Sequence, residues 1–137
     1  MSKSYRMGDV GPGARVQQGE HLTMIENALA PLPDAEILTK RFEALVGRLS
    51  QEFGQDDDSR ELAVTKTRVV AELLGQAANE PGKLRRALID AKHYFLSTAG
   101  WAWEELASII KSDAAQKTIG TIAEATARAA IMHVAGP

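Results

Sequence analysis

The amino-acid sequence predicts an all-α protein, an antiparallel helical bundle of five to six helices that follows a flexible glycine-rich arm. Three observations lead to this fold class. Apolar residues recur at intervals of three and four along most of the chain, which is the period of an amphipathic helix. No run of β-branched residues alternates strictly with polar ones, as a half-buried strand would require. Glycine and proline interrupt the helical pattern repeatedly, so we expect short loops between neighbouring helices.

The composition is that of one globular domain. The chain has 137 residues, of which 45% are hydrophobic and 25% charged. Its 16 basic and 18 acidic residues nearly balance, so nothing attracts the chain as a whole to nucleic acid or to an anionic membrane. Cysteine is absent, which excludes disulfides and thiolate metal sites and fits a reducing compartment. The longest stretch without a charged residue, from His93 to Trp103, is too short to cross a bilayer, and no signal peptide is evident, so we expect a cytoplasmic protein.

Residues 1–19 differ from the rest of the chain because glycine and proline are frequent and apolar residues are scarce. We expect a flexible arm there and a single helical domain over residues 20–137. The first helix is predicted at Glu20–Ala30, where Pro31 and Pro33 close it.

The second and third helices show the clearest apolar stripes. Asp34 is expected to cap the second helix and Gly54 to end it. Its apolar stripe consists of Leu38, Phe42, Leu45 and Leu49, which recur by four, three and four, with Ile37, Val46 and Phe53 beside them. Asp58 and Glu61 are spaced as a capping box for the third. Its predicted inward face consists of Leu62, Val69, Val70, Leu73, Leu74 and Ala77.

Three further helices complete the prediction. Lys83–Ala99 follows the breaker Asn79–Gly82 and turns Leu84, Leu88, Ala91 and Phe95 inward. Gly100 separates it from a helix over Trp101–Lys111. The last helix is predicted to run without interruption from Asp113 to Ala135, with Asp113 and Gln116 as its capping box.

This last helix carries the strongest indication of a protein contact. Asp113, Lys117, Glu124 and Arg128 would share one ridge and form two i,i+4 ion pairs, and the other faces are apolar or small. A helix with so narrow a polar stripe requires contacts on more than one side. These contacts come from another chain, from the domain's own bundle, or from both.

Trp101 and Trp103 mark a second candidate contact at the break after Gly100. Two positions apart on a helix, they cannot face the same way, so we expect one in the core and one exposed or in contact with a partner. The alternative is a tryptophan that fixes the corner of the bundle. The candidate interface residues of both regions are Trp101, Trp103, Ile119, Ile122, Ala123, Ala127, Ala130, Ile131 and Val134.

The helix over residues 83–99 supports an alternative function. It carries Lys83, Arg85, Arg86 and Lys92 against Asp90 alone, and a basic helix can bind the phosphates of a nucleic acid. A phosphate-binding surface usually needs a larger basic excess, however, and the first turn lacks Asn, Gln and Ser for base contacts. These cations are therefore better explained as a solvated face.

No residue pattern indicates catalysis or a metal centre. The glycines of Gly8–Gly13 lack the strand, the helix start and the lysine of a phosphate-binding loop. Asp56–Asp58 lacks the spacing of a calcium loop, and we expect His21, His93 and His133 to be solvated or singly hydrogen-bonded. We therefore expect no enzyme activity, no metal and no cofactor.

Three features together resemble a known class of proteins. They are the glycine-containing segment Gly11–Val16 before a leucine-rich helical pair, the junction Asn79–Leu88, and the small-residue helical tail. This combination resembles the small helical adaptor or oligomerisation modules of bacterial effector and defence systems. The resemblance implies a bacterial module that mediates assembly and brings no catalytic residues.

The sequence thus predicts a non-enzymatic protein–protein interaction or self-assembly module, which acts as an adaptor or a homo-oligomer. The first alternative is a nucleic-acid-binding bundle that uses residues 83–92. The second is a membrane-active amphipathic protein, although Lys117, Glu124 and Arg128 would interrupt its apolar run.

Overall fold

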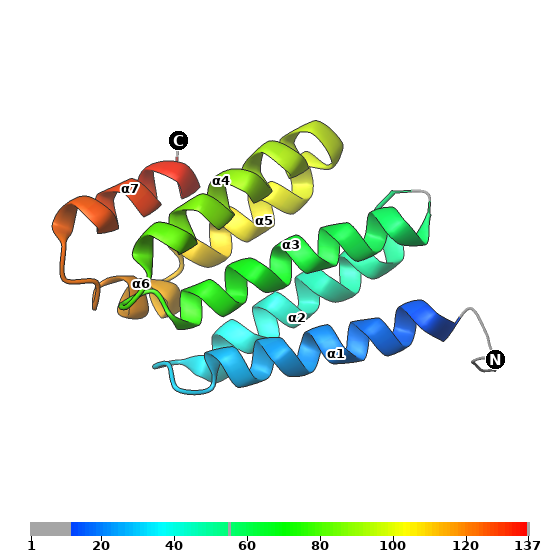
Figure 1. Cartoon of the computed structure of the whole chain (residues 1–137), viewed down its shortest axis with the longest axis horizontal. Helices are drawn as coiled ribbons and strands as arrows, with labels where there is room; N and C mark the ends of the chain where they lie inside the picture. The colour runs from blue at the N-terminus through cyan, green and yellow to red at the C-terminus, as the bar shows by residue number, and fades with distance from the viewer. Residues whose placement is uncertain (1–11, 55, 137) are drawn as a thin grey trace.

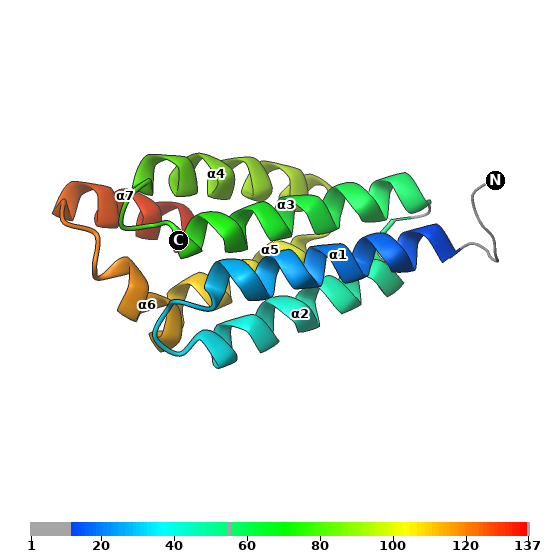
Figure 2. The same cartoon turned by 60° about the horizontal axis from the view of Figure 1, so that its bottom comes forward.

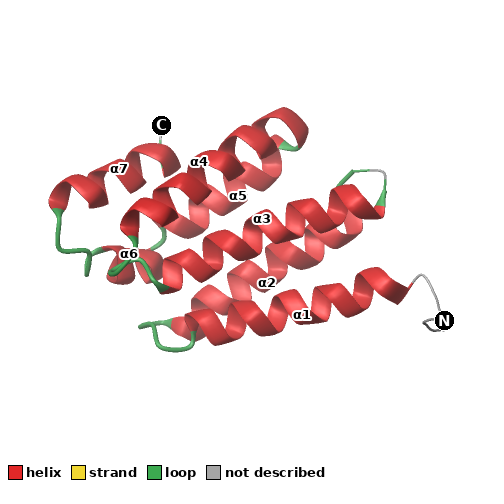
Figure 3. Cartoon of the chain, in the orientation of Figure 1, coloured by secondary structure: helices red, strands yellow, loops and turns green. Residues whose placement is uncertain are grey.

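The computed structural model describes residues 12–54 and 56–136, with side chains from Gln18 onwards. Every regular element in these ranges is an α-helix (Figure 3), which confirms the all-α class. The helices are α1 (Pro12–Leu29), α2 (Ala35–Glu52), α3 (Asp57–Gly75), α4 (Pro81–Thr98), α5 (Gly100–Lys111), α6 (Asp113–Ile119) and α7 (Ala125–Ala135). Their number in the described ranges exceeds the predicted five to six. No helix in this part of the chain is both long and apolar enough to cross a membrane.

The helices lie side by side around one continuous core. Helices α1, α2 and α3 pack against one another, α4 packs on α3, and α5 lies against α2 and α4 (Figures 1 and 2). The short α6 connects to α7, which returns over α4 and α5. Not every neighbouring pair is antiparallel: His21 of α1 contacts Glu61 of α3, and further along both helices Ala28 meets Gly75, so α1 and α3 run in the same direction.

The first helix begins earlier than the sequence predicts. It starts at Pro12 instead of Glu20, so residues 12–19 of the expected arm belong to α1, and residues 1–11 lie outside the described residues. Proline suits the first turn of a helix, because its fixed φ is helical and its missing N–H has no partner to lose there. Gly13 and Gly19 lower helix propensity without preventing a helix.

The apolar stripes of α2 and α4 are confirmed. The four residues of each predicted stripe are buried, and so are Val46 and Phe53, whereas Ile37, expected beside the α2 stripe, is 52% exposed. The third helix differs at its start, where Leu62 is 45% exposed instead of buried, while Val70, Leu74 and Ala77 are in the core.

The predicted helix caps are only partly correct. Asp56, not Asp58, caps α3, and its carboxylate accepts a hydrogen bond from the Ser59 amide at 2.7 Å. This hydrogen bond holds the pKa of the Asp56 carboxyl below its usual range. Asp34 precedes α2 with a left-handed φ of 55° and makes no side-chain cap, and its carboxylate lies 2.7 Å from the Lys117 ammonium instead.

The prediction of one uninterrupted helix from Asp113 to Ala135 is wrong. The chain leaves the helix at Gly120 and resumes it as α7 at Ala125. The link is held by tertiary contacts: the Ile122 side chain is buried, and the Arg128 guanidinium donates hydrogen bonds to the carbonyls of Ile122 and Ala123. These contacts favour the break, because burial of Ile122 and satisfaction of the freed carbonyls offset the lost helical turn.

Because of the break, the four residues of the predicted charged ridge no longer lie along one helix. Lys117 pairs with Asp34 of another helix, and Arg128 binds backbone carbonyls instead of Glu124. At the start of α6 the cap is Ser112, whose hydroxyl accepts a hydrogen bond from the Ala115 amide at 3.3 Å, so the predicted Asp113–Gln116 capping box is wrong.

Candidate functional site

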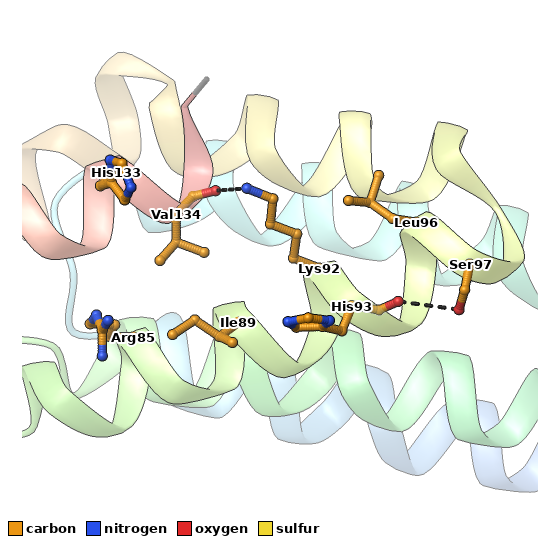
Figure 4. Close-up of a pocket in the computed structure, with 8 residues that line it drawn as sticks. All are labelled: Arg85, Ile89, Lys92, His93, Leu96, Ser97, His133 and Val134. Carbon is orange, nitrogen blue, oxygen red and sulfur yellow. Dashed lines mark hydrogen bonds between the residues drawn. The ribbon is translucent and has the colours of Figure 1, made fainter.

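A cationic groove lies between α4 and α7 (Figure 4), and we call it the α4/α7 groove. Its volume is about 480 Å³. It is lined by Arg85, Ile89, Lys92, His93, Leu96 and Ser97 from α4 and by His133 and Val134 from α7. None of these residues is acidic.

The sequence of α4 explains why one side of this helix forms a groove wall. Arg85, Ile89, Lys92 and Leu96 follow one another by four, three and four, so they share a face. The adjacent stripe, which begins with Leu84 and lies about 100° around the helix, fills the core. The last turn of α7 packs against this outer face and forms the second wall.

Lys92 joins the two walls. Its ammonium donates a hydrogen bond to the Val134 carbonyl at 3.3 Å and lies 5.8 Å from the centre of the Trp103 ring. A cation at a helix C-terminus compensates the free carbonyls and the negative end of the helix dipole. Lys92 therefore holds α7 in place and leaves only part of its charge available to a ligand.

Arg85 and His133 face each other from the two walls at one end of the groove (Figure 4). Both are exposed, and neither forms an ion pair within the described part of the chain. At the other end, Leu96 is 57% exposed, more than any other large apolar side chain described. The Ser97 hydroxyl donates to the carbonyls of His93 and Tyr94, at 3.2 and 3.0 Å, so its proton is bonded to the backbone of its own helix.

A second hollow of about 460 Å³ continues the groove toward α5. It shares Lys92, Leu96 and Val134 with the first, and adds Trp103, Glu104, Ala107, Lys111, Ala135 and Gly136. The two hollows together form a continuous surface around the C-terminal turn of α7, with Leu96 between them.

Most of the interface residues predicted from the sequence lie in the chain's own core. The buried ones are Trp103, Ile119, Ile122, Ile131 and Val134. Ala123 is exposed, while Trp101, Ala127 and Ala130 are half-buried. The structure does not bring these residues together as one accessible surface.

The two tryptophans differ in environment, as their spacing predicts. Trp103 is 7% exposed and packs in the core beside Lys92. Trp101 is half-buried under the Arg48 guanidinium, whose carbon lies 4.1 Å from the ring centre. Trp101 is thus covered in part by a cation from α2.

The four cations of the nucleic-acid alternative do not share one surface. Lys83 pairs with Glu80 at 2.7 Å, and Lys92 is bound to α7. Arg85 lines the α4/α7 groove, whereas the exposed Arg86 does not. The charges available to a phosphate backbone are therefore fewer than the sequence suggests.

A separate cavity of about 740 Å³ surrounds His21, between α1 and α3. His21 is buried and doubly bonded, so the expectation of a solvated or singly bonded side chain is wrong for it. Its Nε2 lies 2.7 Å from a Glu61 carboxylate oxygen, and its Nδ1 lies 3.1 Å from an Arg68 guanidinium nitrogen. Because Arg68 can only donate, Nδ1 is the acceptor and Nε2–H donates to Glu61. Both ring nitrogens are engaged, and this cluster links two helices.

His93 and His133 are exposed, and the described residues contain no group of three histidine, aspartate or glutamate side chains that could hold a metal ion. Comparison with protein-family models, with curated proteins and with solved structures gives no match for this chain.

Proposed function

We propose that this chain is a protein–protein interaction module that holds an acidic, amphipathic segment in the α4/α7 groove. One observation carries the proposal: the exposed Leu96 shares a groove with Arg85 and Lys92, neither of which has a carboxylate partner among the described residues. Clefts of this kind, with apolar surface and a few polar groups that fix orientation, are typical of binding sites.

Physical magnitudes support a mixed apolar and ionic contact. Removing the exposed part of Leu96 from water contributes about 1–2 kcal/mol, because complete burial of a leucine contributes roughly 1.5–3 kcal/mol. A rim ion pair contributes about 0.2–1 kcal/mol and is screened by salt. Apolar burial therefore supplies most of the affinity, while Arg85 and His133 select an acidic partner and orient it.

The proposed contact still involves α7, as the sequence suggests, but it uses other residues than those predicted. A partner reaches the outer face of α4 and the last turn of α7 without unfolding the core. Trp103, Ile119 and Ile131 then act as support from within. The nucleic-acid alternative has less support, because Lys83 and Lys92 are already bonded within the chain.

Two synthetic helical peptides test the proposal. Both carry the same leucines at i,i+4 spacing, one flanked by glutamates and the other by lysines. We expect fluorescence anisotropy to show binding of the acidic peptide only, and amide shifts in the protein's NMR spectrum to map to α4 and the end of α7. Affinity should fall with added salt but persist in part, because the leucine contact is not screened.

Substitutions in the groove provide the control. Arg85→Glu combined with Leu96→Ser should weaken the acidic peptide at least about tenfold, or about 1.4 kcal/mol. Arg86→Glu, which changes the same charge next to the groove, should have no such effect. Equal binding of both peptides, or shifts that map away from α4 and α7, would contradict the proposal. Tighter binding of a single-stranded oligonucleotide than of the acidic peptide would favour the nucleic-acid alternative.

A further inference from the structure

We infer that the segment held by the α4/α7 groove is the N-terminal end of α3 from a second copy of this chain, so that copies join head to tail. The inference rests on the proposed function, because it names the partner of that groove.

The start of α3 has the complementary chemistry. Asp57 and Asp58 are exposed in its first turn, and Asp57 forms an ion pair with Arg60 in the same turn, at 2.9 Å. Asp58 forms no ion pair with any residue the structure describes. Leu62 follows Asp58 by one helical turn on the same face and is 45% exposed. We call Asp57, Asp58 and Leu62 the α3 tip.

Each feature of the α3 tip has a counterpart in the groove. Leu62 matches Leu96, and the aspartates, about one helical turn before Leu62, match Lys92 and His93, which lie about one turn before Leu96 on α4. From Arg85 to Leu96 the groove wall is about 16 Å long, which accommodates about three turns of a docked helix. Leu62 and Leu96 are two of the four large apolar side chains exposed among the described residues, and contact between them removes both from water.

The two surfaces lie on different helices and share no residue, so a contact between them is heterologous. The groove lies between α4 and α7, whereas the α3 tip lies at the start of α3, next to residue 55 (Figure 1). A second copy that occupies the groove still presents its own free groove. Such a contact does not close on itself in a pair, and it generates rings or open filaments.

Two complementary variants test this arrangement in the full chain. The groove variant carries Arg85→Glu and Leu96→Ser, and the tip variant carries Asp58→Lys and Leu62→Ser. All four positions are surface-exposed, so both variants should keep the helical circular dichroism of the parent chain. We expect the weight-average mass of the parent chain in sedimentation experiments to rise with concentration beyond a dimer.

Each variant alone should remain at 14.8 kDa, because it lacks one of the two surfaces. Mixed in equal amounts, they should form a dimer of twice that mass and nothing larger, since the intact tip of one occupies the intact groove of the other. Either variant should weaken self-association at least about tenfold. A variant with Arg86→Glu and Ile37→Ser, which changes an equally exposed cation and apolar residue elsewhere, should assemble as the parent chain does.

The outcomes separate this inference from the proposed function. If the acidic peptide binds the groove but the parent chain stays monomeric, the head-to-tail inference is wrong and the groove serves another protein. If the parent chain forms a dimer that does not grow, and the mixed variants do not associate, the contact is symmetric and the inference is again wrong. If neither peptide binding nor self-association occurs, both proposals fail.

Discussion

Replacing Gly75 with alanine should force α1 and α3 apart. A Cβ atom at this position would lie 2.3 Å from the Ala28 carbonyl oxygen and 3.1 Å from its carbonyl carbon, whereas ordinary contacts begin at 3.4 Å. The obstructing atom belongs to the backbone of a helix, so no side-chain rotation relieves the overlap. The helices must separate locally by about 1 Å, the difference between 3.4 and 2.3 Å.

Two effects of opposite sign set the magnitude. Alanine improves helix propensity over glycine by up to about 1 kcal/mol. Overpacking at a tight contact costs about 1–3 kcal/mol, and the overlap at Gly75 is severe enough to favour the upper part of that range. We therefore expect Gly75→Ala to lower the free energy of unfolding by about 1–2 kcal/mol, which corresponds to a fall in Tm of roughly 4–8 °C.

Gly47 provides the matched control. A Cβ atom there meets nothing within 4 Å, and Gly47 lies in the middle of α2. Gly47→Ala should therefore raise the free energy of unfolding by about 0.5–1 kcal/mol. Urea unfolding followed by far-ultraviolet circular dichroism measures the free energy of unfolding of both variants. Both substitutions are made in the chain that also carries Arg85→Glu and Leu96→Ser, so that self-association does not contribute to stability. A Gly75→Ala chain as stable as the Gly47→Ala chain would refute the close approach of α1 and α3.

Three further substitutions test other contacts. Burial, with a further contribution from Glu26, raises the pKa of the Glu43 carboxyl above 4.5. As pH rises above 4.5, the folded state therefore retains a proton that the unfolded state releases, and the free energy of unfolding falls. Glu43→Gln should therefore be more stable than the parent chain at pH 7 and lose that advantage below pH 4.5, and an equal stability at pH 7 in urea unfolding would contradict this. Ser112→Ala removes the cap of α6 and should cost about 1 kcal/mol in the same assay, whereas no loss would mean that the cap contributes nothing. Arg128→Met leaves the Ile122 carbonyl without its hydrogen-bond donor, so amide hydrogen exchange in residues 120–125 should accelerate at least about fivefold. Unchanged exchange would argue against a structural role for Arg128.

The parts of the fold that the sequence predicts correctly are those where local pattern and tertiary packing agree. In α2 and α4 the stripe residues repeat at helical spacing and are all buried, although Ile37 beside the α2 stripe is exposed. Gly54 ends the second helical segment as expected, with a φ of 63° that glycine adopts without strain.

The errors arise where tertiary contacts decide against local propensity. Residues 119–125 contain no proline, and a single glycine such as Gly120 need not stop a helix; burial of Ile122 and the hydrogen bonds of Arg128 favour the break there. The glycines before Glu20 suggest a loop, although the helix starts at Pro12. Leu62 fits the apolar period of α3, but its side chain is 45% exposed.

The candidate groove could be predicted only in part. The recurrence of Arg85, Ile89, Lys92 and Leu96 along one face of α4 is visible in the sequence. The opposing position of His133 is not, because it depends on the turn that separates α6 from α7. A helix that continued from Asp113 to Ala135 would not return over α4 in this way.

A photocrosslinking residue placed at Leu96 tests the central claim most directly. Equal amounts of ¹⁴N- and ¹⁵N-labelled chains distinguish crosslinks between copies from those within one copy, and mass spectrometry locates the attached residue. The account predicts crosslinks between copies at residues 57–62, which should disappear when the partner carries the tip substitutions. Crosslinks confined to one copy, or between copies at positions outside the start of α3, would contradict it.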